Sequence, residues 1–284
     1  MSDLDALMAA VLAGRNYRHV SPEFVRAIGA RELARRPNLK AAVKATKNAL
    51  HQAGGAFQDT PIDYDRALAL LRHALAADPS QDGEPFRAAL RAVMTGHTST
   101  RERLPILDDF FAMTLANIPP PARVLDVACG LGPLARPWLG LPPATEYLAY
   151  DIYADQIAFL NEVFILAGWP GRAEVRDVIG RPPDTPADVA FVLKTLPCLE
   201  AIDKNAPGRL LDALNAPLLV VSFPAQTLGG RRKGMAAHYE AHFRALLDTR
   251  GWPAERFEFA TELAFLVRKE KPQISQISQI EEGD

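Results

Sequence analysis

The stretch that decides the fold is Arg123-Val124-Leu125-Asp126-Val127-Ala128-Cys129-Gly130-Leu131-Gly132. It begins with mainly apolar residues, which is typical of a short buried strand. Two glycines follow, and glycine lets a ligand approach the backbone closely because it carries no Cβ atom. Ligands of open α/β sheets bind beyond the carboxyl ends of the strands. The stretch therefore predicts a strand, a glycine turn and a binding site at that turn.

On the carboxyl side of this stretch, strands and helices are predicted to alternate. We expect strands at 146–151, 173–178, 188–193, 218–223, 256–260 and 262–268, and a long amphipathic helix at 154–167. Alternating units of this kind imply a mostly parallel sheet that is covered on both faces. The last two strands have no helix between them, so we expect a final antiparallel hairpin. Together these elements predict an α/β, Rossmann-like domain over residues 106–270.

The amino-terminal part, residues 1–105, is predicted to be an all-helical domain. Ser21-Pro22-Glu23 has the cap and the first-turn proline of a helix start. A basic helix is expected from Leu39 to the Gly54-Gly55 pair, and further helices over 64–76 and 86–94. At the other end of the chain, residues 271–284 repeat a Gln-Ile-Ser triplet and then turn acidic. We expect this tail to be disordered.

The composition, 48% hydrophobic and 23% charged residues, is ordinary for a globular protein. No apolar run is long enough to cross a bilayer, and the start, Met1-Ser2-Asp3-Leu4-Asp5, is acidic where a secretory signal would be basic. Cys129 and Cys198 lie in apolar surroundings, so we expect reduced thiols rather than a disulfide or a metal site. A cytoplasmic protein without membrane contact or bound metal is the expectation.

The formal net charge of −2 conceals a basic segment between Gly14 and His51, where nine basic residues face two acidic ones and the formal charge is +7. The basic residues are Arg15, Arg18, Arg26, Arg31, Arg35, Arg36, Lys40, Lys44 and Lys47. Clustered cations attract phosphate backbones, whereas most charge runs are only solvated helix faces. Charge alone leaves both interpretations open.

Two aspartates favour a nucleoside site beside the glycine turn. Asp151 ends the second predicted strand, where a carboxylate can accept hydrogen bonds from both hydroxyls of a ribose. Asp177 and Val178 follow the third predicted strand and would suit an adenine, with an acid for the exocyclic amine and an apolar side chain for the ring face. Capping of a loop is the ordinary role of a single aspartate, but both together with the glycine turn favour a cofactor.

The glycine turn also bears on which cofactor is bound. A dinucleotide fingerprint needs a third glycine that opens the helix receiving the pyrophosphate. Ala135 occupies that position, and Pro133 interrupts the turn. S-adenosylmethionine carries no phosphate and needs no helix N-terminus. We therefore predict S-adenosylmethionine as the cofactor.

Four long segments carry a resemblance to a known family. They are His97-Thr98-Ser99-Thr100-Arg101-Glu102-Arg103-Leu104, Leu193-Lys194-Thr195-Leu196-Pro197-Cys198-Leu199-Glu200, residues 222–224 with 228–235, and residues 39–51. The chain resembles the aminoglycoside-resistance 16S rRNA methyltransferases that modify N7 of guanine 1405, over almost its whole length except the carboxyl-terminal tail. The resemblance implies methylation of the assembled 30S subunit and resistance to aminoglycosides. A monomer would suit docking on so large a particle.

The resemblance also implies roles for individual residues. Either Arg101 or Arg103 would bind the carboxylate of the cofactor, because a guanidinium can bind a carboxylate through two hydrogen bonds. The other cofactor contacts would be Ala128, Gly130, Gly132, Asp151, Asp177, Val178 and Leu193. The RNA contacts would be Arg15, Arg18, Lys40, Lys44 and Lys47 in the basic segment, and Arg231 and Lys233 in a glycine-containing loop near the target base.

No catalytic general base is expected, because N7 of guanine carries an unprotonated lone pair near pH 7. Catalysis would come from alignment of the reacting atoms and from desolvation, on a guanine that is flipped out of its helix. Three alternatives are a small-molecule methyltransferase with a helical cap, an inactive RNA-binding assembly factor, and methylation of a nearby adenine at N1. The basic segment disfavours the first and the glycine turn with Asp151 the second. Only the resemblance disfavours the third.

Overall fold

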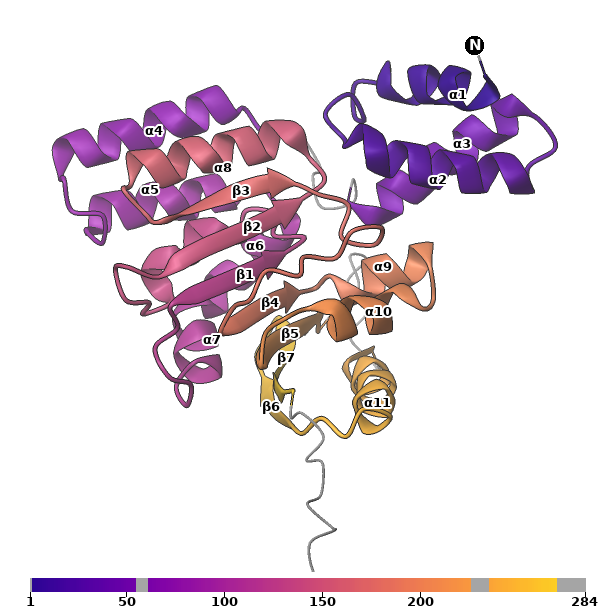
Figure 1. Cartoon of the computed structure of the whole chain (residues 1–284). Helices are drawn as coiled ribbons and strands as arrows, with labels where there is room; N and C mark the ends of the chain where they lie inside the picture. Colours follow the sequence, from indigo (N-terminus) through magenta and orange to yellow (C-terminus); the bar gives the residue numbers. More distant parts are fainter. Residues whose placement is uncertain (1, 55–60, 226–234, 270–284) are drawn as a thin grey trace, which may run out of the picture.

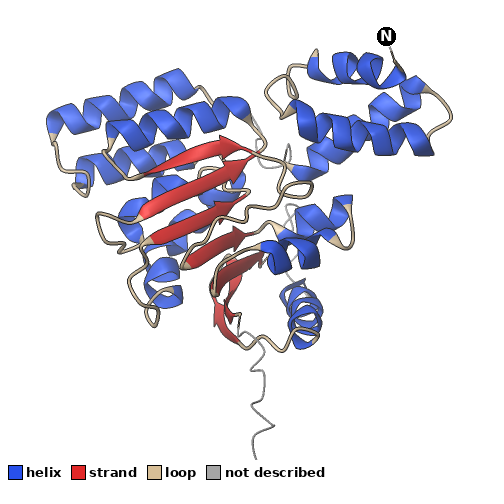
Figure 2. Cartoon of the chain, viewed as in Figure 1, coloured by secondary structure: helices blue, strands red, loops and turns tan. Residues whose placement is uncertain are grey.

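The computed structural model describes residues 2–54, 61–225 and 235–269, and over these residues helices cover both faces of a seven-stranded sheet (Figures 1 and 2). The strands are β1 (Arg123–Val127), β2 (Glu146–Asp151), β3 (Gly171–Val175), β4 (Val189–Leu193), β5 (Leu218–Pro224), β6 (Ala254–Glu258) and β7 (Glu262–Arg268). The helices are α1 (Asp3–Leu12), α2 (Pro22–Arg35), α3 (Leu39–Ala53), α4 (Tyr64–Ala77), α5 (Glu84–Met94), α6 (Thr98–Arg103), α7 (Leu107–Thr114), α8 (Ala154–Leu166), α9 (Leu196–Ile202), α10 (Ala206–Ala213) and α11 (Met235–Asp248), with short 3₁₀ helices η2 (Leu104–Ile106) and η3 (Gly132–Trp138).

The strand order is β3-β2-β1-β4-β5-β7-β6. Strands β1 to β5 pair in parallel, whereas β7 runs antiparallel to both β5 and β6. The predicted Rossmann-like fold and its final antiparallel hairpin are therefore confirmed. From β1 the chain builds outward to β2 and β3 and then returns to β4 on the other side of β1. This reversal opens a crevice between the carboxyl ends of β1 and β4, where open α/β sheets bind their ligands.

The two faces of the sheet have separate hydrophobic cores, because neighbouring residues of a strand point to opposite faces. Val124 and Phe191 belong to the core under α4, α5, α7 and α8. Leu125 and Val192 belong to the core under α9, α10 and α11. Since both faces are buried, β4 is apolar along its whole length and β1 is apolar except at Arg123 and Asp126, which is why both strands are recognisable in the sequence.

The helices that precede the sheet form two groups (Figure 1). Leu71 of α4, Phe86 of α5 and Phe110 of α7 are buried in the core of the sheet. Helices α1, α2 and α3 instead share a core of their own, which includes Leu7 and Phe24. The predicted domain boundary at residue 105 stays a prediction. Hydrophobic packing in the structure changes between α3 and α4, well before that position.

Most predicted elements occur with ends shifted by a few residues. Ser21 caps α2 and Asn38 caps α3, both through a side-chain oxygen that accepts a backbone N–H. The strand predicted at 173–178 is wrong at both ends, since β3 runs from Gly171 to Val175. It ends before Asp177, which turns the chain by accepting hydrogen bonds from the N–H groups of Ile179 and Gly180. The sequence analysis placed no individual helix at α1, α6, α7, α9, α10 or α11, although it predicted residues 1–105 to be all-helical. In the described part of the chain, no helix is long and apolar enough to cross a membrane.

Candidate functional site

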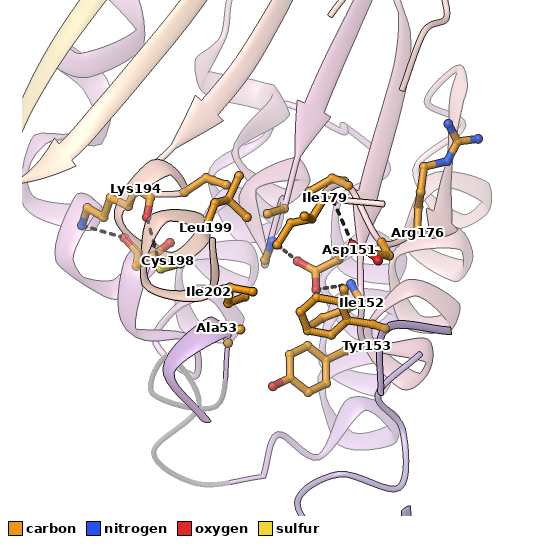
Figure 3. A pocket seen from close by; sticks show the side chains of 18 of the residues that line it. Ala53, Asp151, Ile152, Tyr153, Arg176, Ile179, Lys194, Cys198, Leu199 and Ile202 are labelled. Carbon is orange, nitrogen blue, oxygen red and sulfur yellow. Dashed lines mark hydrogen bonds between the residues drawn. The ribbon is translucent and has the colours of Figure 1, made fainter. Parts of the chain in front are cut away.

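An open pocket lies at the crevice between β1 and β4 (Figure 3). Ala128 and Gly130 enter it from the turn after β1, Asp151 from the end of β2, and Leu193 from the end of β4. The loop after β3 adds further lining residues, among them Asp177 and Val178. The carboxyl ends of four parallel strands thus meet at one cavity. Six of the predicted cofactor contacts lie there together.

The turn after β1 is built from unusual backbone conformations. Ala128 and Gly130 both have a φ of 53°, in the left-handed region that costs a residue with a side chain of the order of 1 kcal/mol. A Cβ at Gly130 would lie 2.7 Å from the imidazole of His97, so only glycine fits there. Strained backbone of this kind concentrates at ligand sites. The sequence predicted the glycine but gave no sign that Ala128 shares its conformation.

Gly132 serves packing rather than the pocket. It is not among the pocket-lining residues, and a Cβ at this position would lie 2.6 Å from Oδ2 of Asp126 in β1. The hydroxyl of Tyr147 donates to the same oxygen at 2.7 Å. Burial raises the pKa of Asp126 to about 7. After Gly132 the chain forms the 3₁₀ helix η3 instead of an α-helix, so this turn does not present the N-terminus of a full helix to a ligand.

Asp151 is the buried carboxylate at the centre of the pocket. Its Oδ2 accepts the N–H of Gly130 at 2.9 Å, and its Oδ1 accepts the N–H of Ile152 at 2.7 Å (Figure 3). Burial raises the pKa of Asp151, while these backbone donors oppose the rise. The same hydrogen bonds fix the carboxylate beside the glycine turn. The backbone N–H of Tyr153 and the side chain of Gln156 also hydrogen-bond to this carboxylate.

Asp177 combines a capping role with a place in the pocket. Its Oδ1 accepts the N–H groups of Ile179 and Gly180 at 2.9 and 3.1 Å, so the ordinary loop role that the sequence left open is real. Among the described residues no hydrogen bond is found to its Oδ2, which leaves that atom for a ligand. Val178, Ile179 and Leu199 add apolar surface to the same pocket, as the flat ring of a base requires.

The guanidinium of Arg103 is bound to a buried glutamate and not to the pocket. Its Nε lies 2.8 Å from Oε1 of Glu262 at the start of β7, and both side chains are fully buried. Its guanidinium also lies over the ring of Phe110, 5.0 Å from the centroid. Lys194, at the end of β4, pairs with the same Glu262 at 3.3 Å and with Glu102 at 2.7 Å. Arg103 is therefore part of a buried ion cluster, formed by Arg103, Glu262, Lys194 and Glu102, and does not line the pocket.

Arg101, the other predicted carboxylate ligand, lies on the exposed side of α6. Its guanidinium donates to the backbone oxygen of Thr95 and to the hydroxyl of Thr98. It is not among the pocket-lining residues either, but His97 and Ser99 of the same segment are. Of the two arginines, Arg101 is thus the one whose guanidinium is outside the buried ion cluster and one turn from the pocket.

The sequence analysis missed several residues of the pocket. His97 is buried against Gly130, and burial together with the nearby Arg103, Lys194 and Arg101 lowers its pKa to about 4. Lys194 has a φ of 58° and lines the pocket at the end of β4. Both residues belong to segments that carry the family resemblance, which was the available signal. Phe24 and Tyr153 also line the pocket, and nothing in their local sequence indicates it.

The predicted RNA contacts of the basic segment lie on the surface of the three-helix unit. Arg15, Arg18, Lys40 and Lys44 are exposed and Lys47 is half-buried. The hydroxyl of Tyr17 donates to the backbone oxygen of Lys47, which joins the turn after α1 to α3. Other cations of the segment are paired within the unit: Arg31 and Arg36 with Glu32, and Arg26 with Asp5. Arg231 and Lys233 lie outside the described residues.

The pocket fits an adenosyl group. It offers a fixed carboxylate at Asp151, a second carboxylate oxygen at Asp177 and apolar walls on the β3 and α9 sides. The cradle at Gly130 leaves no room for any side chain. A group with ribose hydroxyls and a flat base can be held by these features. In the described part of the chain, no cluster of three or more His, Cys, Asp or Glu side chains could hold a metal ion.

Comparison with known proteins identifies the family. Residues 13–266 match the family described as "Ribosomal RNA methyltransferase (FmrO)". The chain belongs to this family. It is 43% identical over 268 residues to a 16S rRNA (guanine(1405)-N(7))-methyltransferase of Frankia casuarinae, with 94% of each chain covered. It is 39% identical to the protein of the same name from Micromonospora echinospora, with 94% of this chain and 97% of that chain covered.

Two solved structures that this chain resembles are also those of 16S rRNA methyltransferases. The crystal structure of 16S rRNA methyltransferase RmtF in complex with S-adenosyl-L-homocysteine has a TM-score of 0.81 and 36% identity, over 95% of this chain and 99% of that one. The structure of the 16S rRNA methylase RmtB has a TM-score of 0.76 and 28% identity, over 94% and 98%. The likeness extends over the α1–α3 unit as well as the sheet.

The buried ion cluster generates a stability prediction. Replacing Glu262 by Gln leaves two buried cations with one fewer anion, so we expect the free energy of unfolding in urea to fall by about 3–5 kcal/mol. Arg103→Met should cost a similar amount. The double variant Arg103→Met/Glu262→Gln should cost clearly less than the sum, because neither charge is then left without the other.

The control is Arg26→Met, which removes an exposed ion pair with Asp5 at 3.8 Å. Its cost should stay below about 1 kcal/mol. Additive losses in the double variant would show that Arg103 and Glu262 do not act as a pair.

Proposed function

We propose that this chain transfers a methyl group from S-adenosylmethionine to N7 of guanine 1405 of 16S rRNA within the assembled 30S subunit, and thereby gives resistance to aminoglycosides. The observation that carries the proposal is the pocket at β1 and β4 in a chain of the FmrO family, with Asp151 fixed against the glycine turn. The relatives that match most of its length are named for this reaction. A cytoplasmic monomer is part of the proposal, because the substrate is a ribosomal particle.

The cofactor would be held by groups at the carboxyl ends of the strands. Asp151 would accept hydrogen bonds from the ribose hydroxyls, and Asp177 would accept one from the exocyclic amine of the adenine. Val178 and Leu193 would contact the apolar faces. Arg101 would bind the carboxylate of the methionine part, because Arg103 is bound to Glu262. S-adenosylmethionine supplies an electrophilic methyl group on a sulfonium.

The residues of the pocket support a reaction without a general base. His97 has a pKa of about 4, because burial and the cations Arg103, Lys194 and Arg101 disfavour its charged form. It is therefore neutral near pH 7 and too weak a base to remove a proton efficiently. The lone pair of guanine N7 requires no such removal. What the pocket has to provide is alignment of the nucleophile with the methyl group and exclusion of water.

The basic surface of the three-helix unit would position the RNA. Arg15, Arg18, Lys40 and Lys44 are exposed and would contact phosphates, which set position rather than sequence. Arg231 and Lys233 are proposed to act near the target base. Structured RNA is recognised largely by shape and backbone, so an added helical unit beside the pocket suits a ribosomal substrate.

The direct test is methylation of purified small subunits with a labelled cofactor. The modified base is mapped by borohydride and aniline cleavage followed by reverse transcription, and we expect a single stop at guanine 1405. Label in an adenine would support the N1 reaction instead. Label in free small molecules but not in subunits would overturn the proposal, and binding of subunits without any label would assign the chain to an inactive assembly factor.

Asp151→Ala should weaken cofactor binding without weakening binding of the subunit. The variant loses a ribose acceptor and the hydrogen bond that fixes the glycine turn, so we expect the dissociation constant of S-adenosylhomocysteine to rise by about a hundred-fold, two hydrogen bonds of an ionised acceptor being worth about 3 kcal/mol. Isothermal titration calorimetry measures it.

Asp188→Ala is the matched control for Asp151→Ala. Asp188 also accepts two backbone N–H groups, from Ala122 and Arg123, but at the amino ends of the strands. This variant should bind S-adenosylhomocysteine like the wild type. Equal loss of cofactor and subunit affinity in Asp151→Ala would contradict the assignment of Asp151.

Reversing the charge at Lys40, Lys44 and Lys47 should lower subunit affinity and flatten its dependence on salt. Each lost phosphate contact removes the release of roughly one counterion, so the logarithmic salt slope should fall by about two to three units. Binding is measured over a series of salt concentrations. Arg172→Glu/Arg268→Glu should leave the slope unchanged, because Arg172 lies near the amino end of β3 and Arg268 pairs with the first residue of β5, both at the end of the strands opposite the pocket. An unaltered slope in the lysine variant would exclude this face as the RNA contact.

A further inference from the structure

We propose that the α1–α3 unit forms a wall of the cofactor pocket, so that binding of the cofactor and binding of RNA strengthen each other. The inference rests on the proposed function, since it takes an adenosyl cofactor for the pocket and RNA for the basic surface. Its evidence is that three segments lining the pocket are also the segments on which the unit is seated.

The first of these segments follows β2. The N–H of Ser21 donates to the backbone oxygen of Ile152 at 2.7 Å, and the N–H of Ala154 donates to that of His19 at 2.8 Å. Val20 and Tyr153 form an antiparallel bridge between these bonds. The loop that carries Asp151 thus pairs directly with the chain between α1 and α2.

The second segment follows β3. Nη2 of Arg181 lies 2.7 Å from Oε2 of Glu23, which is in the first turn of α2. Ile179, between Asp177 and Arg181, packs against the core of the α1–α3 unit. The loop that carries the proposed adenine contacts is therefore bound to the same helix.

The third segment is the end of α9. The guanidinium of Arg31 donates to the backbone oxygen of Ile202, and α3 packs on α9. Ile202 lines the pocket (Figure 3). Three segments near the carboxyl ends of the strands thus hold the α1–α3 unit in one orientation.

The unit also contributes side chains to the pocket itself. Phe24 of α2, with 3% of its surface exposed, lines the pocket together with Ala53 and Gly54 at the end of α3. The ring of Tyr153 lies against Gly54, where a Cβ would come within 2.9 Å of it. A cofactor in this pocket contacts both the sheet and the helices that carry the basic surface.

This arrangement has a thermodynamic consequence. A ligand that contacts two bodies favours the arrangement in which both are seated. RNA bound to Lys40 and Lys44 and to other parts of the chain favours a seated unit for the same reason. By linkage, whatever factor the cofactor adds to RNA affinity, RNA adds to cofactor affinity. The expected factor is about ten-fold, within the range common for coupled sites.

The test compares two substitutions in the same three-helix core. Phe24→Ala removes a side chain that lines the pocket, whereas Ile28→Ala removes a buried side chain of the same helix that does not. Thermal unfolding of both full-length variants shows whether they remain folded. S-adenosylhomocysteine binding is measured by calorimetry, and small-subunit binding is measured with and without saturating S-adenosylhomocysteine.

In the wild type, S-adenosylhomocysteine should tighten subunit binding by about ten-fold. In Phe24→Ala, its own dissociation constant should rise by about ten-fold, the equivalent of about 50 Å² of apolar contact, and the coupling should fall towards one. Ile28→Ala should keep both properties within about two-fold. Glu23→Gln, a surface change that cannot unfold the core, should reduce the coupling by about two-fold, as expected for an exposed ion pair.

Equal effects of Phe24→Ala and Ile28→Ala, or a wild-type protein in which S-adenosylhomocysteine leaves subunit affinity unchanged, would overturn the inference. The proposed function would be untouched in that case, because methylation of guanine 1405 is measured separately. An enzyme that methylates subunits without coupling contradicts only the inference. A chain that methylates no subunit contradicts the function.

Discussion

The buried contact between Arg103 and Glu262 is the constraint on which the site depends. It joins the end of α6 to the first residue of β7, and Lys194, which follows β4, pairs with the same anion. Burial raises the pKa of Glu262, but Arg103 and Lys194 lower it more, and the net pKa lies below that of an ordinary glutamate. The carboxylate therefore stays charged. Its charge fixes the segments on either side of the crevice relative to each other.

The geometry of the pocket depends on the buried ion cluster of Arg103, Glu262, Lys194 and Glu102. Lys194 is held in a left-handed conformation while its Nζ bonds to Glu102, and this places α6 across the end of β4. His97, which precedes α6, is thereby placed against Gly130. A glycine turn and a neutral imidazole thus meet because a glutamate in the final hairpin holds an arginine and a lysine. The arrangement of the turn thus depends on the Arg103–Glu262 ion pair, which does not line the pocket.

Much of this arrangement can be predicted from the sequence, and the limit has a physical cause. The apolar strands, the glycine turn and Asp151 are local signals, so their positions follow from short stretches of chain. The pairing of Arg103 with Glu262 spans 159 positions, and no local pattern shows which of two arginines on a short helix is buried. Phe24 and Tyr153 lie together at the pocket because the three-helix unit packs against the loop after β2. This contact joins parts of the chain that are far apart in the sequence. Likewise α4 and α5 read as part of a separate helical region but pack on the sheet, since an amphipathic helix does not specify its partner.

The position of Glu262 so late in the chain also affects the order in which the protein can be completed. During synthesis Arg103 leaves the ribosome long before its anion, and β7, which lies between β5 and β6, is the last strand to appear. Until then the side of β5 that β7 will cover is an open edge, and Arg103 and Lys194 have no shared counter-charge. Contacts this distant in sequence form slowly. The crevice therefore cannot be completed before residue 262 has been made, and a product truncated ahead of β7 would lack both the cover of β5 and the anion that Arg103 and Lys194 share.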